Sequence, residues 1–199
     1  MMGPMSLRLV IFDLDGTLLA SPLDFDAIRA EIGLPDGRPI LEALQPLPPD
    51  ERRRADAIID RHEAQAVRAS RLLPGAADLV AWLRGRGVQV ALLTRNSRAS
   101  VEEAARRHGL VFDAAVTRED HEPKPSPKGV RHLMAACDAR TEETVLVGDF
   151  RFDVEAGTAA GVRTVALSAQ PTDWAEEATW QAADLAGVRR ILADLLDDG

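Results

Sequence analysis

Short runs of apolar residues alternate along the chain with longer segments in which apolar residues recur every three or four positions. The first run, residues 9–12, carries no charge and is followed directly by Asp13, which is the pattern of a strand buried on both faces. Further apolar runs predict strands at residues 88–93, 112–116, 144–148 and 162–167. The segments between them predict helices over residues 75–84, up to His108, over 126–136 and over 152–160, and helical pieces within 173–196. This alternation predicts an α/β fold, a Rossmann-like parallel sheet with helices on both faces.

Residues 20–73 interrupt the alternation with a segment that has many prolines and no strand-like run. The prolines divide it into predicted helices at residues 23–32, a short turn at 40–44 and a longer helix from Asp50, as N-cap, to about Arg71. The apolar face of the long helix includes His62, which the pattern places as a core or edge histidine and not as a metal ligand. The opposite face is predicted to be exposed to solvent and carries Arg52, Arg53, Asp56, Asp60 and Glu63. We therefore expect a small α-helical domain of residues 20–73, inserted into a core of residues 7–19 and 74–199.

Polar side chains follow the predicted strands at the points where the strands end. Asp13 and Asp15 follow the first strand, Thr94 the second and Asp149 the fourth, and Lys124 lies in the loop after the third. Taken alone, the segment after the first strand also fits an ordinary acidic turn. However, the carboxyl ends of parallel strands share one edge of a sheet, where ligands bind, so we expect these five side chains to converge.

The chemistry of this group favours a metal ion and a phosphoryl group. Crowded carboxylates repel each other unless a cation lies among them, and a small set of hard oxygen ligands suits Mg²⁺. An ammonium and a hydroxyl beside Mg²⁺ suit a phosphoryl group, whose oxygens need charge neutralisation and hydrogen-bond donors.

Four segments, in order, resemble the motifs of the haloacid dehalogenase-like hydrolases. They are Asp13-Leu14-Asp15-Gly16-Thr17, Leu92-Leu93-Thr94, Lys124-Pro125-Ser126-Pro127 and the segment from Gly148-Asp149 to Asp153. The resemblance extends over residues 7–167, and residues 20–73 resemble the helical cap that phosphoglycolate phosphatases and β-phosphoglucomutases insert after the first motif. The dehalogenases proper lack an acid at the position of Asp15, so this residue favours phosphoryl transfer.

The resemblance implies a role for each motif residue. Asp13 is the expected nucleophile, which forms an aspartyl-phosphate, and Asp15 the expected general acid and then base. Thr94 is expected to bind a phosphoryl oxygen, and Lys124 to neutralise charge on the nucleophile and the phosphoryl group.

The expected cofactor is Mg²⁺, held by Asp13, the backbone carbonyl of Asp15 and Asp149. Asp153 is expected to orient Lys124 or a metal-bound water instead of binding the metal directly. Arg95 and Asn96, beside the second motif, are further candidates for substrate binding.

The composition limits the partners. A net charge of −8 and a pI near 5.0 count against nucleic acid and against an anionic membrane surface. No apolar run approaches the roughly 20 residues of a membrane span, no secretion signal is apparent, and Cys137 is the only cysteine, so we expect a cytoplasmic protein without disulfides. The pattern favours no particular oligomeric state.

The expected partner is a small phosphorylated metabolite, because a cap this short is predicted to leave little room. Arg29 and Arg38 in the cap, and Arg95 in the core, are candidates for pairing with a carboxylate on a compound such as phosphoglycolate. A phosphosugar mutase of the β-phosphoglucomutase type remains an alternative. So does a non-catalytic phosphate-binding module, although such a module is expected to have a damaged motif and none is damaged here.

Overall fold

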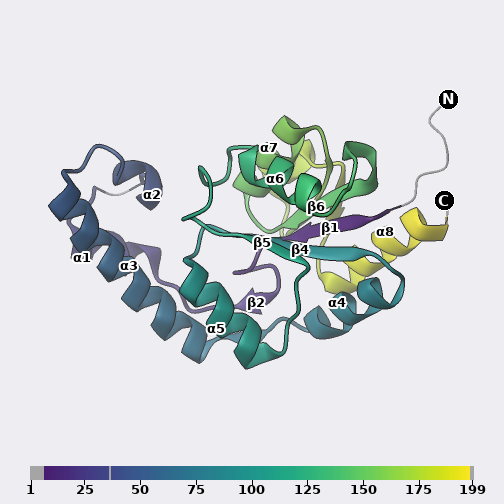
Figure 1. The fold of residues 1–199 in the computed structure, drawn as a ribbon, viewed down its shortest axis with the longest axis horizontal. Coiled ribbons are helices and arrows are strands. Elements are labelled where there is room, and N and C mark those ends of the chain that lie inside the picture. The colour runs from purple at the N-terminus through teal and green to yellow at the C-terminus, as the bar shows by residue number, and fades with distance from the viewer. Residues whose placement is uncertain (1–6, 36, 198–199) are drawn as a thin grey trace.

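The computed structural model describes residues 7–35 and 37–197, which contain a six-stranded parallel sheet flanked by helices (Figure 1). The strand order is β5-β4-β1-β6-β7-β8. In chain order the strands are β1 (Leu9–Phe12), β4 (Gln89–Leu93), β5 (Ala114–Val116), β6 (Thr144–Gly148), β7 (Arg163–Leu167) and β8 (Trp180–Ala182). Phe12, the last residue of β1, lies in register with Leu92 of β4 and Val147 of β6. The residues that follow these three strands therefore emerge at the same edge of the sheet. The predicted fold class is confirmed.

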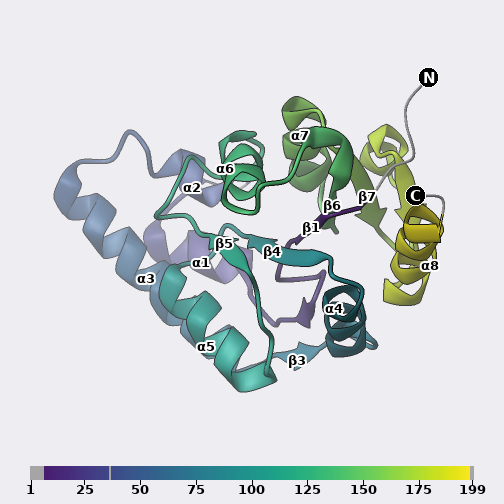
Figure 2. The ribbon, with the colours of Figure 1, turned by 45° about the vertical axis from the view of Figure 1, so that its right-hand side comes forward.

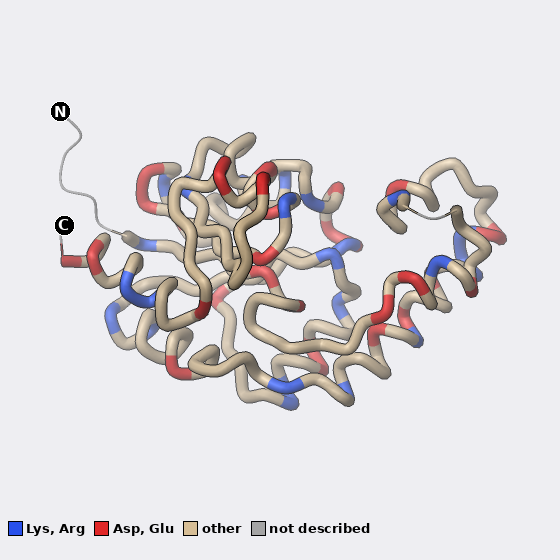
Figure 3. Tube along the Cα trace, turned by 180° about the vertical axis from the view of Figure 1, so that it is seen from behind, with Lys and Arg blue, Asp and Glu red and all other residues tan. Residues whose placement is uncertain are grey.

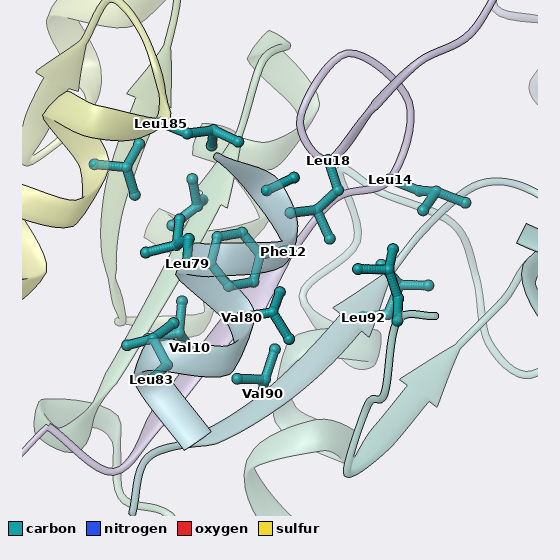
Figure 4. Close-up of a cluster of buried hydrophobic side chains, with 14 of the residues drawn as sticks. Val10, Phe12, Leu14, Leu18, Leu79, Val80, Leu83, Val90, Leu92 and Leu185 are labelled. Atoms are coloured by element: carbon teal, nitrogen blue, oxygen red, sulfur yellow. The ribbon is translucent and has the colours of Figure 1, made fainter. Parts of the chain in front are cut away.

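The side chains of β1 divide between two hydrophobic clusters, as expected where successive residues of a strand point to opposite faces. Val10 and Phe12 pack against α4 (Ala76–Gly85) and α8 (Leu185–Asp197), as Figure 4 shows for Leu79, Leu83 and Leu185. Leu9 and Ile11 belong to the other cluster, with residues of α6 (Lys128–Ala136) and α7 (Arg151–Ala160). The sheet is thus covered on both faces, with α4 and α8 on one and α6 and α7 on the other (Figures 1 and 2). A fifth helix of this region, α5 (Arg98–His108), follows β4.

Between β1 and α4 lie three helices with a hydrophobic cluster of their own. They are α1 (Phe25–Ile32), α2 (Ile40–Ala43) and α3 (Pro49–Ala69), and their buried residues are Ile28, Ile40, Leu44, Ala55 and Ile59. The Asp24 side chain caps α1, and Gly33, in the left-handed conformation, ends it. The chain enters and leaves this segment through a short antiparallel pair, β2 (Leu19–Ala20) and β3 (Arg71–Leu72). In Figure 1 the three helices extend from one end of the sheet, and α3 packs against α5.

Several element boundaries differ from the sequence prediction. The long helix begins at Pro49, because a proline at the first helical position has a suitable φ and no N–H to satisfy, so Asp50 is not the N-cap. Asp50 instead pairs with Arg53 one turn later. The short strands β2, β3 and β8 were not predicted. Two 3₁₀ helices, η1 (Thr141–Glu143) and η2 (Asp173–Glu177), complete the elements.

The charged face of α3 is only partly exposed. Acidic and basic residues are interspersed along this helix (Figure 3), and Arg52 pairs with Asp56 at 3.0 Å. Glu63, predicted to be exposed, is buried, because α5 packs against this part of α3. His62 is half-buried and lies 2.8 Å from the Glu31 carboxylate of α1.

Among residues 7–35 and 37–197, no helix combines the length and apolar character needed to cross a membrane.

Candidate active site

The eight site residues predicted in the core line one cavity of about 980 Å³ at the carboxyl ends of the central strands. Asp13 follows β1, Thr94 follows β4 and Asp149 follows β6, and Lys124 comes from the loop between β5 and α6. The cavity is bounded on its other side by α1, α2 and the segment that precedes α1. The full set of these eight residues is Asp13, Asp15, Thr94, Arg95, Asn96, Lys124, Asp149 and Asp153.

Lys124 is buried between two carboxylates. Its Nζ lies 2.7 Å from Oδ1 of Asp13 and 2.5 Å from Oδ1 of Asp153, and only 3% of the side chain is exposed. Burial alone disfavours the ammonium, but the attraction of Asp13 and Asp153 outweighs it and raises the pKa of Lys124. Asp153 also accepts a hydrogen bond from the backbone N–H of Phe150 at 3.2 Å, so both of its oxygens are engaged. Lys124 therefore carries a positive charge directly beside Asp13.

Asp15 is held by a side-chain amide. Nδ2 of Asn96 donates a hydrogen bond to Oδ2 of Asp15, and the backbone N–H of Asn96 donates to Oγ1 of Thr94 at 3.2 Å. Burial, reinforced by the charge of Asp13, raises the pKa of Asp15 to about 6. A carboxyl group with a pKa near neutrality can both donate and accept a proton at physiological pH.

Asp149 is placed by the segment that follows β1. Thr17 donates a hydrogen bond to Oδ1 of Asp149 at 2.8 Å. Gly16 has φ of +81°, and a Cβ added to it would lie 2.0 Å from Oδ2 of Asp149, so the turn can approach this carboxylate only because it contains glycine. Burial and the charge of Asp13 raise the pKa of Asp149 to about 7.

Three carboxylates of the site lie close enough to share a metal ion. Oxygen atoms of Asp13, Asp149 and Asp153 are all within 4.8 Å of one another. Carboxylate oxygens are hard donors, which suit Mg²⁺ or Ca²⁺.

A sequence model of the haloacid dehalogenase-like hydrolases matches residues 7–161. The chain belongs to this family. It is 36% identical over 172 residues to an uncharacterized hydrolase of Saccharomyces cerevisiae, which covers 83% of this chain and 79% of the yeast protein. It is 31% identical over 195 residues to a phosphoglycolate phosphatase of Pseudomonas syringae pv. tomato, and this match covers 81% of this chain and 69% of the phosphatase. The crystal structure of a hydrolase from Pseudomonas syringae shares the fold, with a TM-score of 0.80 at 20% identity over 96% and 98% of the two chains.

In this hydrolase, Arg95 connects the site to α2. Its guanidinium forms two hydrogen bonds with the Glu42 carboxylate, at 2.7 and 2.9 Å, and a further one with the carbonyl oxygen of Lys124. It also lies 4.9 Å from the centre of the Phe152 ring. Arg95 therefore already has a carboxylate partner, which the sequence did not indicate.

The two arginines of the helical segment differ. Arg29 lines the cavity, pairs with Asp26 at 2.8 Å and donates to the carbonyl oxygen of Arg38 at 3.1 Å. Arg38 is exposed and does not line the cavity, so the prediction that it reaches the substrate is not supported by its position.

Sequence reasoning missed Glu63, which also lines the cavity of the hydrolase. A signal was present, because Glu63 shares one helix face with the apolar residues Ile59, Ala66 and Val67. In the structure all four residues are buried. The charge of Glu63 outweighed this spacing in the prediction.

Proposed function

We propose that this hydrolase is a Mg²⁺-dependent phosphatase that cleaves a small phosphomonoester through an aspartyl-phosphate on Asp13. The observation that carries the proposal is the difference between two neighbouring carboxyl groups. Asp13 lies against the buried ammonium of Lys124, whereas Asp15 is held by Asn96 and has a pKa of about 6. A nucleophile beside a fixed positive charge and an acid that titrates near neutrality are the two groups that this reaction requires.

The reaction proceeds in two displacements. In the first, a carboxylate oxygen of Asp13 attacks phosphorus, the bond from phosphorus to the alcohol oxygen breaks, and Asp15 donates a proton to that oxygen. In the second, Asp15 takes a proton from water, the water oxygen attacks phosphorus, and the bond to Asp13 breaks to release phosphate. The Thr94 hydroxyl and the Lys124 ammonium bind the phosphoryl oxygens throughout.

The residues of the site fit Mg²⁺. The proposed ligands are the carboxylates of Asp13 and Asp149 and the backbone carbonyl of Asp15, all of them hard oxygen donors. Asp153 supports the site from outside, because Lys124 and the N–H of Phe150 occupy both of its oxygens. When bound, Mg²⁺ neutralises negative charge on the phosphoryl group and on the attacking carboxylate.

We propose a small phosphorylated metabolite as the substrate, with residues 20–73 acting as a cap over the cavity and the activity located in the cytoplasm. The similarity to phosphoglycolate phosphatases supports a phosphorylated acid, and Arg29 and Arg95 are the cavity residues that can pair with its carboxylate. The cavity is wider than the short cap predicts, since its volume of about 980 Å³ is at the upper end of the range for ligand pockets. Exclusion of phosphoproteins and nucleic acids from the cavity is supported by the position of α1 and α2 along its wall, and not by a small volume.

The proposal is tested by assaying released phosphate from a panel of phosphorylated acids and sugars in the presence of Mg²⁺. Asp13→Asn should lower the rate to below about one hundredth of the wild-type rate while leaving the fold intact. Asp50→Asn is the matched control, because this carboxylate is 87% exposed and lies outside the cavity, and it should retain activity. A higher residual rate in Asp13→Asn contradicts the covalent mechanism, and formation of a sugar-phosphate isomer in place of phosphate favours the mutase alternative.

A further inference from the structure

Glu63 of α3 is a buried carboxylate whose partners all belong to the segment after β4 and β5. Only 3% of the residue is exposed, and a buried carboxylate is stable only if it is paired and hydrogen-bonded. Its Oε2 accepts the backbone N–H of Ser97 at 3.0 Å and lies 2.8 and 2.9 Å from the hydroxyls of Ser97 and Ser100. Its Oε1 accepts a hydrogen bond from the guanidinium of Arg118. Both oxygens are thus engaged, and Glu63 has no free oxygen to offer a substrate without giving up one of these contacts.

One peptide group of the active-site loop is held at both ends, by Glu63 and by the backbone of Arg118, whose side chain Glu63 also binds. The peptide group between Asn96 and Ser97 donates its N–H to Glu63 and accepts, on its carbonyl, the backbone N–H of Arg118 at 3.1 Å. Ser97 is the N-cap of α5, so the Glu63 carboxylate also lies at the positive end of that helix, where a negative charge is favoured. The same glutamate therefore fixes both the peptide group and the start of the helix that follows it.

The fixed peptide group is bonded to the Cα of Asn96, and Asn96 itself makes two contacts within the site. Its side chain donates to Asp15, and its own N–H donates to the Thr94 hydroxyl. A shift of the Asn96 Cα would therefore displace both the amide that holds the proposed acid and the N–H that donates to the proposed phosphate-binding hydroxyl.

We infer that Glu63 is a positioning residue, which holds the Asn96 loop so that Asn96 keeps Asp15 in place for proton transfer. This inference rests on the proposed function. With this role, α3 contributes to the proposed reaction as well as to the cap, because a residue from the segment 20–73 positions the proton-transfer group of the core.

The test uses Glu63→Gln and p-nitrophenyl phosphate, whose leaving group needs no acid. Misplacing Asp15 should leave the first step intact and slow the attack of water, which needs Asp15 as a base. We expect Glu63→Gln to release a burst of about one p-nitrophenolate per active site, with a first-turnover rate within threefold of wild type. Steady-state phosphate release by the variant should then be at least tenfold slower than steady-state release by the wild type. With an alkyl phosphate, where the first step also needs the acid, the first-turnover rate itself should fall at least tenfold.

Asp60→Asn is the matched control, because Asp60 also pairs with Arg118 from α3 but is 57% exposed and does not contact Ser97. It should show neither the burst nor the slow steady state. Ser100→Ala, which removes one contact to Oε2, is the second variant in case Glu63→Gln does not fold, and it should show the same pattern with an effect of at least threefold.

Steady-state rates within twofold of wild type in both Glu63→Gln and Ser100→Ala would overturn the inference. A first-turnover rate on p-nitrophenyl phosphate that falls in parallel with the steady-state rate would also overturn it, because that result indicates general distortion. Failure of the proposed function gives a different result, since the wild-type protein would then release no phosphate or Asp13→Asn would remain active.

Discussion

Replacement of Lys124 by methionine tests whether the buried ammonium holds the site together. Methionine has a similar length and shape but no charge, so Lys124→Met leaves Asp13 and Asp153 beside each other without their shared cation. Removing one partner from a buried ion pair destabilises a protein by about 3–5 kcal/mol, because the remaining charge is left without compensation. For a chain of this size, roughly 2–4 °C of melting temperature is lost per kcal/mol, so we expect a decrease of about 6–20 °C.

The loss should also depend on pH. The pKa of Asp153 is raised to about 6 by burial, while Lys124 acts to lower it, so removal of Lys124 should raise this pKa further. A raised pKa means that the folded variant binds more protons than the unfolded chain, and its stability then falls as the pH rises. The difference in unfolding free energy between wild type and variant should therefore be larger at pH 8 than at pH 5.

The measurement is thermal and urea unfolding of both proteins at the two pH values. Lys128→Met is the matched control, because its side chain is 63% exposed and its partner Glu122 is exposed as well, so we expect no measurable loss. A decrease for Lys124→Met no larger than that of the control, or a larger loss at pH 5, would refute the argument that Lys124 compensates buried negative charge.

Three further predictions follow from the geometry of the site. Chelation by EDTA should abolish phosphate release, Mg²⁺ should restore it, and Ca²⁺ should inhibit it because its larger, looser coordination misplaces the nucleophile; full activity after exhaustive chelation would contradict the metal proposal. Gly16→Ala should lose about 1–2 kcal/mol of stability through its positive φ and should also lose activity by displacing Asp149. Gly87→Ala, with φ of +76° and no neighbour within 4 Å, should lose stability only, and equal activity in the two variants would disprove the displacement. Glu42→Gln should free Arg95 and raise kcat/KM for phosphoglycolate relative to ethyl phosphate about threefold, since a partly exposed ion pair contributes up to ~1 kcal/mol; an unchanged ratio would exclude Arg95 as the carboxylate partner.

The convergence of the site residues can be predicted from the sequence because it depends only on local patterns and on one rule of topology. An apolar run that ends in Asp13, and another that ends in Asp149, are visible without any structure. Parallel pairing of β1 with β4 and β6 then brings their carboxyl ends together. The same reasoning cannot find β8, because its three residues have no periodicity and form a strand only by pairing with β7.

The partners that α3 and α2 contact at the site cannot be read from the sequence, for a different reason. The spacing of Glu63 with apolar residues indicates a buried position, but which element covers it depends on tertiary packing, and in the structure that element is α5. The pairing of Glu42 with Arg95 likewise joins residues from separate segments, and neither residue carries a local signal for the other.

The position of β1 in the sheet affects folding during synthesis. This strand precedes the other strands in the chain, yet it lies in the middle of the sheet, and its partner β6 ends at Gly148. During synthesis on the ribosome, one edge of a wholly apolar strand therefore has no neighbour until most of the 199 residues have been translated. An open apolar strand edge can pair with other chains, so this interval exposes the nascent protein to aggregation. A truncated chain that ends before Thr144 would thus be an aggregation-prone fragment that lacks Asp149 as a partner for Asp13, and not a smaller enzyme.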